Sequence, residues 1–328
     1  MKREKRSKGR ADIALALLAI AELAIVAYLL LFSSYKTDAV VGADQVTVST
    51  NLTVGNAFPE VINVTINNNN AIDLTPNSTT TVVVVAIVRD FNGDNDISAV
   101  TAEFFDNAAS FYGDADDNNY HYTNSTCAID TTYGDSFEAN ATCTFEVWYY
   151  ANNATWNATV FVNDSINTNG TGSNTQTINT LLALGLPDSI DYGVVNATFV
   201  SDERLANVTN FGNVMFNLSL TGYAVTSGDG YAMNCSLGSV QNISIEYEKY
   251  NVTASNPGSL TLAQFDSLYR NLTSSSVVNT FNLNYRTNDT DVNTDEVNTT
   301  YWRIYVPPGV AGTCTGNIVF GAVQAAGT

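Results

Sequence analysis

Four oxygen-bearing side chains alternate along the stretch RDFNGDNDI, residues 89–97. Asp90, Asn92, Asp94 and Asp96 stand at every second position. Carboxylate and amide oxygens are the ligands that Ca²⁺ takes in proteins. The stretch departs from the EF-hand loop, which needs a glycine at its sixth position and a glutamate at its twelfth. The sequence therefore predicts either a calcium site of another kind or a tight Asn-Gly turn between two strands.

Other chemistry has few candidate residues in this chain. The one histidine, His121, stands in the polar stretch DDNNYHY, where we expect a solvated loop residue. No paired histidines are present for an HExxH zinc site, and neither a GxSxG elbow nor a phosphate-binding loop occurs. The sequence predicts a protein that is not an enzyme and that has no cofactor apart from the possible calcium.

Four cysteines form the next group of reactive residues. An even number of cysteines in an exported chain predicts disulfides, whereas zinc sites use close CxxC spacing, which is absent here. Their order along the chain favours Cys127 with Cys143 and Cys235 with Cys314, although three pairings are formally possible.

An apolar segment near the N-terminus indicates on which side of a membrane the rest of the chain lies. Residues 11–32 contain about twenty apolar positions in succession, which is the length that spans a bilayer. Central Glu22 costs about 3 kcal/mol, and the surrounding Leu, Ile, Val and Phe residues outweigh that cost. Residues 1–10 are strongly basic and are predicted to stay in the cytoplasm. We predict a single-pass anchor at the cell membrane, a stalk over residues 33–44, and extracellular C-terminal domains.

Two alternatives to an uncleaved anchor remain open. Residues 41–43 would suit signal-peptide cleavage before Asp44. The pair Lys8-Gly9 before the apolar segment is similar to the leader of type IV pilins, which is cleaved after the glycine. Glu22 is either a tolerated acid or a contact with another helix, in a membrane oligomer or a filament core.

Alternating apolar and polar residues predict β-strands after the anchor, for example at 46–54, 62–66 and 214–220. The unbroken apolar run at 82–88 predicts a central strand buried on both faces. Helical periodicity is confined to residues 261–271, where a threonine and a glutamine at the start form a potential capping box.

A polar stretch that contains glycine divides this β-rich region into two parts. The stretch SINTNGTGSNTQTINT, residues 165–180, has the composition of a linker. We therefore predict an all-β protein with two antiparallel β-sandwich domains, at residues 45–164 and 181–328, following one transmembrane helix.

Charge and sequons indicate the kind of surface. The 328 residues have a net charge of −19, and six of the thirteen basic residues lie within the first ten positions. Such an acidic exterior excludes nucleic acid as a partner and suits cations. Asn-x-Ser/Thr sequons are frequent, and seven fall on the polar phase of a predicted strand or in a loop, where we predict glycosylation: Asn51, Asn63, Asn153, Asn157, Asn196, Asn217 and Asn242.

Several stretches resemble known domains. DFNGDNDI (90–97) and CTFEVWYYANNATWNATVFVND (143–164) resemble an immunoglobulin-like domain of archaeal secreted and cell-surface proteins. LPDSIDYGVV (186–195), VTNFGNVMFNLSLTG (208–222) and VPPGVAGTCTGNIVF (306–320) are similar to its partner domain, which is related to cell-adhesion domains. The resemblance implies a non-catalytic, structural or adhesive envelope glycoprotein with a disulfide inside each domain. Its partners would be envelope proteins, another cell surface or further copies of itself, and the alternative is a pilin-like filament subunit.

Overall fold

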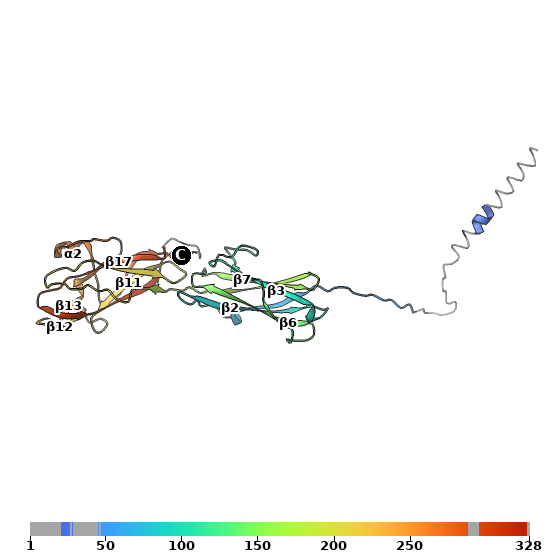
Figure 1. The fold of residues 1–328 in the computed structure, drawn as a ribbon, viewed down its shortest axis with the longest axis horizontal. Coiled ribbons are helices and arrows are strands. Elements are labelled where there is room, and N and C mark those ends of the chain that lie inside the picture. Colours follow the sequence, from blue (N-terminus) through green and yellow to red (C-terminus); the bar gives the residue numbers. More distant parts are fainter. Residues whose placement is uncertain (1–20, 27, 29–44, 46, 288–294, 327–328) are drawn as a thin grey trace, which may run out of the picture. The chain divides into compact units, whose positions relative to one another are not determined.

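The computed structural model describes residues 21–26, 28, 45, 47–287 and 295–326 (Figure 1). Gly55–Thr328 forms one compact unit, and this unit contains two separate hydrophobic cores. The described strands pair antiparallel throughout, and the sheets enclose each core as a β-sandwich. The predicted antiparallel β-sandwiches are confirmed, and the described residues are mostly β.

The first sandwich consists of two four-stranded sheets, with the strand orders β1-β2-β6-β5 and β4-β3-β7-β8. Short 3-10 turns, η1 (Asn67–Asn69) and η2 (Asp94–Asp96), interrupt the connections. The strands are β1 (Glu60–Ile66), β2 (Thr79–Arg89), β3 (Ile97–Asp106), β4 (His121–Asn124), β5 (Ala128–Asp130), β6 (Glu138–Trp148), β7 (Thr155–Asp164) and β8 (Asn169–Thr177).

Alternate side chains of these strands fill the first core. In β2 the even-numbered residues from Val82 to Val88 are buried, while the odd-numbered ones are only half-buried. The unbroken apolar run therefore has one core face and one partly solvated face, and the prediction of a strand buried on both faces was wrong, because solvent reaches the odd-numbered side chains on the outer side of this sheet. Trp156 is fully buried at the centre of the core, and its ring lies 4.9 Å from that of Phe104.

The segment predicted as a linker is mostly strand β8, at the edge of the second sheet. Its glycines allow close packing rather than flexibility. A Cβ on Gly170 would stand 2.0 Å from the carbonyl oxygen of Pro59, and a Cβ on Gly172 would stand 2.7 Å from the side chain of Val61. The composition that resembled a linker is thus required where β8 passes the start of β1.

The N-terminal part of the predicted strand pattern also differs from the structure. Residues 47–54 form no strand, and Val48, Leu52 and Val54 are exposed, because none of the described strands pairs with this segment. In β1 the pairing with β2 shifts between Val61 and Asn63. This bulge turns Ile62 outward although its phase predicted a core position.

The second sandwich places a five-stranded sheet, β15-β14-β17-β10-β9, against two three-stranded sheets, β16-β11-β19 and β13-β12-β18. A 3-10 turn, η3 (Ile245–Tyr247), and a helix, α2 (Leu262–Leu268), lie in its connections. The strands are β9 (Leu184–Gly185), β10 (Arg204–Asn210), β11 (Phe216–Tyr223), β12 (Tyr231–Gly238), β13 (Asn242–Ser244), β14 (Glu248–Asn251), β15 (Arg270–Asn271), β16 (Val277–Leu283), β17 (Val297–Ile304), β18 (Val310–Thr315) and β19 (Asn317–Gln324).

The short helix predicted in this region is confirmed. Thr261 and Gln264 form the capping box at the start of α2, with each side chain bonded to the backbone N–H of the other. Phe265 is the buried residue of the helix. Trp302 of β17 is fully buried in the second core and packs near Tyr250 of β14, with 5.4 Å between the ring centroids.

One buried asparagine joins the segments that lie between the two cores. The Asn213 side chain donates to the carbonyl oxygens of Ala151 at 3.0 Å and Asn179 at 3.1 Å. Its own Oδ1 accepts from the backbone N–H of Leu181 at 2.7 Å. All three backbone groups belong to segments that connect strands. The Asn213 side chain therefore provides hydrogen-bond partners for backbone groups that lie outside the strand pairing.

The predicted membrane segment lies largely outside the described residues. Residues 21–26 are helical, and Glu22 is exposed there. Within the described ranges, no helix is both long and apolar enough to span a membrane. The anchor, the stalk and the helix contact at Glu22 therefore stay predictions.

Each sandwich contains one disulfide. Cys127 pairs with Cys143 of β6 across 16 residues, and Cys235 of β12 pairs with Cys314 of β18 across 79 residues. The structure thus has the pairing that the order of the cysteines favoured, with no free cysteine in the described residues.

These disulfides close loops of very different length, and a longer loop loses more entropy on closure. We expect replacement of Cys235 and Cys314 by alanine to lower the unfolding free energy by about 4.5 kcal/mol, and replacement of Cys127 and Cys143 by about 3 kcal/mol. Urea unfolding followed by circular dichroism measures both. A larger loss for the shorter loop would contradict the expected order.

Candidate metal site

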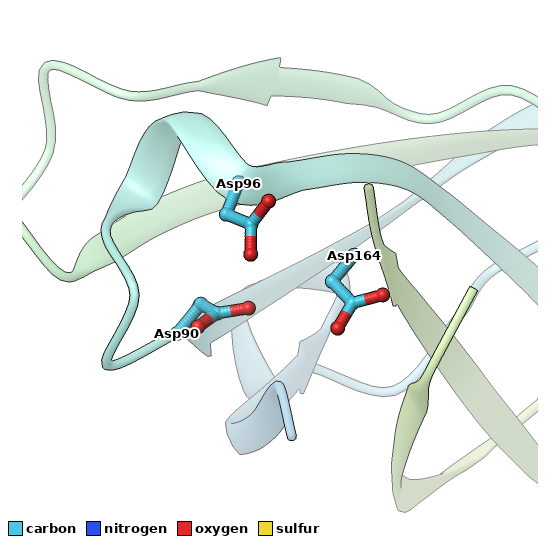
Figure 2. A group of neighbouring side chains, drawn as sticks. All are labelled: Asp90, Asp96 and Asp164. Carbon is cyan, nitrogen blue, oxygen red and sulfur yellow. The ribbon is translucent and has the colours of Figure 1, made fainter. Parts of the chain in front are cut away.

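Three aspartates meet at one end of the first sandwich (Figure 2). Asp90 follows the last residue of β2, Asp96 ends the turn η2, and Asp164 ends β7. One carboxylate oxygen from each lies within 4.8 Å of the others. Figure 2 shows the three carboxylates converging on one space between the strand ends. This is a geometry in which one cation can touch three acidic side chains.

Asp90 is the buried member with an unused oxygen. Its side chain is fully buried, and Oδ1 accepts from the backbone N–H of Asn92 at 2.8 Å. Oδ2 has no hydrogen-bond partner among the described residues. Burial raises the pKa of Asp90, and the nearby charges of Asp96 and Asp164 raise it further, against the bond from Asn92. A positive charge beside Oδ2 would therefore stabilise the ionised form of the Asp90 carboxylate.

Asp164 is the member of the cluster whose two carboxylate oxygens both accept hydrogen bonds. Its Oδ1 accepts from the backbone N–H groups of Ile166 and Thr168 at 3.1 and 2.7 Å. Its Oδ2 accepts from Asn56 Nδ2 at 2.6 Å and from the Thr168 hydroxyl. Burial alone would raise the pKa of Asp164, but the bonds from Thr168 and Asn56 lower it overall. Asp164 therefore carries a fixed negative charge toward the other two carboxylates.

Asp96 completes the cluster at its half-exposed side. Its Oδ1 accepts from the Ser165 hydroxyl. Within the described residues, none of the three carboxylates forms an ion pair with a basic side chain. Three like charges at this distance repel one another, so a divalent cation would stabilise the cluster. The all-oxygen donor set suits Ca²⁺ or Mg²⁺ rather than a softer metal.

The sequence pattern named two of these three residues. Asn92 Oδ1 instead accepts from the backbone N–H of Ala57 at 2.6 Å, and buried Asp94 lies outside the cluster. Asp164 was missed because it is distant in sequence. Pairing of β3 with β7 puts Asp164 opposite Ile97, directly beside Asp96. Asp96 directly precedes β3 and Asp164 is the last residue of β7, and the register between these strands brings the two together.

His121 differs most from its sequence interpretation. It is buried rather than solvated, and its ring stacks on Phe105 at 5.6 Å. Its Nδ1 lies 3.0 Å from Asp116 Oδ1, and its Nε2 lies 3.2 Å from Glu103 Oε2. Both carboxylates are acceptors, so only the doubly protonated ring can donate to both. The histidine thus holds the loop before β4 onto β3.

The predicted glycosylation sites remain accessible to different extents. None of the seven asparagines is buried. Asn153, Asn157, Asn217 and Asn242 are half-buried, and Asn51, Asn63 and Asn196 are exposed. Their modification stays a prediction.

The cluster of Asp90, Asp96 and Asp164 leads us to expect that Ca²⁺ stabilises the folded protein against unfolding. Saturating Ca²⁺ at one hundred times its Kd should raise the unfolding free energy by about 2.7 kcal/mol over that in chelator, because only the folded chain assembles the three carboxylates. The gain should shrink from pH 7.5 to pH 5, because the raised pKa of Asp90 makes protons compete with the metal. Thermal unfolding with Ca²⁺ or EDTA measures both effects.

Neighbouring aspartates provide the matched variants for this test. Asp90→Asn should abolish the calcium response and should stabilise the chelated protein, because it removes a repelled charge. Asp94→Asn, four residues away and outside the cluster, should keep the full response. Identical unfolding midpoints with Ca²⁺ and EDTA in the unsubstituted protein would exclude the site.

Comparisons with known proteins find no matching family model and no matching curated protein. Among solved structures, a carbohydrate-binding module of the β-sandwich superfamily aligns at 12% identity over 83% of this chain and 99% of its own, with a TM-score of 0.24. A chaperone–tip adhesin complex of CFA/I fimbriae aligns at 12% identity over 82% and 85%, with a TM-score of 0.29. The C-terminal domain of a Streptococcus pyogenes antigen I/II-family protein aligns at 10% identity over 81% and 99%, with a TM-score of 0.22. Because these TM-scores are low, the fold described above is based on strand pairing in this chain alone.

Proposed function

We propose that this protein is a non-catalytic surface glycoprotein that displays two immunoglobulin-like β-sandwiches outside the cell from an N-terminal membrane anchor. Its role is structural or adhesive. The acidic sandwiches face solvent, cations and neighbouring surfaces, and a divalent cation stiffens the end of the first one. Its partners are envelope proteins, other cell surfaces or further copies of the chain.

The observation that carries this proposal is the presence of one disulfide in each sandwich. Disulfides persist in oxidising compartments and are rare in the cytosol. An extracellular location also agrees with the strongly basic segment that precedes the apolar one, since such segments remain inside.

Further support comes from what the reactive side chains do. His121 is held between Glu103 and Asp116, and the four cysteines are bonded to one another. Their engagement in structural contacts favours a scaffold over a catalyst. The assignment of the first domain as immunoglobulin-like rests on its two antiparallel sheets around one core, which includes Trp156 of β7 and Cys143 of β6.

Topology of the intact protein tests the proposal. Cells producing the full chain should show both sandwiches to a membrane-impermeant label, and the protein should remain with membranes after carbonate washing. Under denaturing, non-reducing conditions no cysteine should react with a thiol reagent, because all four are oxidised. A soluble intracellular product with four reactive thiols would refute an extracellular role.

The mature N-terminus distinguishes the anchor from its alternatives. N-terminal sequencing should find Met1 or Lys2 if the segment is an uncleaved anchor. A start at Arg10 would instead identify a pilin-like subunit whose helix forms a filament core, and a start at Asp44 would identify a freely secreted protein.

A further inference from the structure

The last strand of the second sandwich, β19, has an edge that no described strand covers. It lies at one end of the sheet β16-β11-β19, where it pairs with β11 alone. It is eight residues long and contains neither a charged residue nor a proline. Natural sheets usually protect an exposed edge with charges, prolines or very short strands. β19 has none of these protections, so its edge is suited to accept a further strand.

The register shows which backbone groups of β19 face this edge. Ala325, directly after the strand, donates to the carbonyl oxygen of Met215 at 2.9 Å. Hydrogen-bonded and non-hydrogen-bonded pairs alternate along an antiparallel ladder, and the pairing of β19 with β11 runs without a shift. The odd-numbered residues of β19 therefore bond to β11. The backbone N–H and C=O groups of Ile318, Phe320 and Ala322 point to the uncovered edge.

The core of this sheet is less complete at β19 than at the opposite edge. In β16, which forms the opposite edge, the core residues Phe281 and Leu283 are buried. The residues of β19 that pack against the same core are only half-buried: Ile318, Phe320 and Ala322. A cavity of about 280 Å³ adjoins the first two of them. A strand added beside β19 would cover these side chains, as β11 covers the other side.

The segment that precedes the first sandwich has the sequence pattern of such a strand. Residues 47–54 alternate polar and apolar side chains, and the apolar Val48, Leu52 and Val54 are exposed. None of the described strands pairs with this segment, and its eight residues match the length of β19. It contains no charge, so the acidic surface of the protein does not repel it. Asn51 lies on the polar phase, so a glycan there would point to solvent.

The segment cannot reach β19 of its own chain. Asn56 donates to Asp164 at the end of β7, whereas the carbonyl oxygen of Ala151, before the start of β7, accepts from Asn213. The ten residues of β7 span about 33 Å between these two contacts. β19 packs on the second core, on the far side of the Asn213 contact. Two residues from position 54 to position 56 span at most about 7 Å, so the added strand must come from another copy.

We propose that residues 47–54 of one copy add as a β-strand to the β19 edge of a second copy, with Val48, Leu52 and Val54 toward its core. Each chain offers one such segment and one such edge, so the contact is head-to-tail and repeats along a row of copies. A second copy is one of the partners in the proposed function, and the inference rests on that function for the location of both elements outside the cell. Cleavage after Gly9 or before Asp44 would keep the segment in the chain.

Paired cysteines test this contact in the full chain. All four native cysteines are in disulfides, so an introduced cysteine is the one free thiol. One tagged chain carries Ser49→Cys or Thr53→Cys, on the polar phase of the segment. A chain with a different tag carries Val319→Cys or Val323→Cys, on the outer face of β19. After mixing in detergent and oxidation with copper phenanthroline, at least one of the four combinations should form a disulfide between the two tagged chains.

Two further variants make the test specific. Val278→Cys is the matched control, because it is exposed on β16 at the opposite edge of the same sheet, and it should not cross-link. Leu52→Gln, added to the segment chain, should lower the cross-linked yield about tenfold, because a leucine side chain no longer becomes buried. Leu52 is 87% exposed in the single chain, so the unfolding midpoint should not change.

The outcomes separate this inference from the proposed function. No cross-link to either β19 cysteine, or an equal cross-link to Val278→Cys, would overturn strand addition even if both sandwiches are labelled at the cell surface. A β19 cross-link in purified protein whose sandwiches are not labelled on cells would support the contact between copies and contradict the extracellular location.

Discussion

A charge buried in a protein core must be paired and hydrogen-bonded, and this constraint shapes the interior of both sandwiches. Arg303 is fully buried, and its guanidinium donates to the carbonyl oxygens of Ser201, Asn256 and Gly258 and to the Tyr269 hydroxyl. Several connecting segments of the second sandwich therefore converge on one side chain. An apolar residue at this position would remove the donors to these carbonyl groups, of which that of Ser201 is buried, so the arginine helps to fix where the connections lie.

Two buried carboxylates, Asp90 and Glu248, depart from this rule because each keeps one oxygen without a partner in the part of the chain that the structure describes. Burial raises the pKa of both, but their neighbours differ. Asp90 adjoins two further acids, which favours a cation of higher charge and several oxygen ligands. Glu248 accepts from the Tyr192 hydroxyl, and burial is the main cause of its raised pKa. An unpartnered buried carboxylate oxygen thus lies within a cluster of acids in the first sandwich and beside a tyrosine in the second.

Local patterns in the sequence predicted local features well and pairwise geometry poorly. The helix cap at Thr261, the strand alternation in β11 and the order of the disulfides each depend on short spacings or on chain order. Asp164 could not be joined to Asp96 because that contact depends on the register of β7 against β3. Gly170 resembled a linker residue because sequence does not reveal that another backbone passes within contact distance of it. The burial of His121 depends on two acids that lie 5 and 18 residues away.

The candidate metal site also contacts the segment that leads into the first sandwich. Asn56 donates to the same Asp164 carboxylate that faces the cluster, and Asn92, between Asp90 and Asp96, accepts from the N–H of Ala57. The first residues of the compact unit are therefore held by the strand ends that form the site. A cation that drew Asp164 and the Asp90 turn together would change the acceptors available to residues 56 and 57. Because binding free energies are reciprocal, docking of this segment and cation binding must influence each other to the same extent.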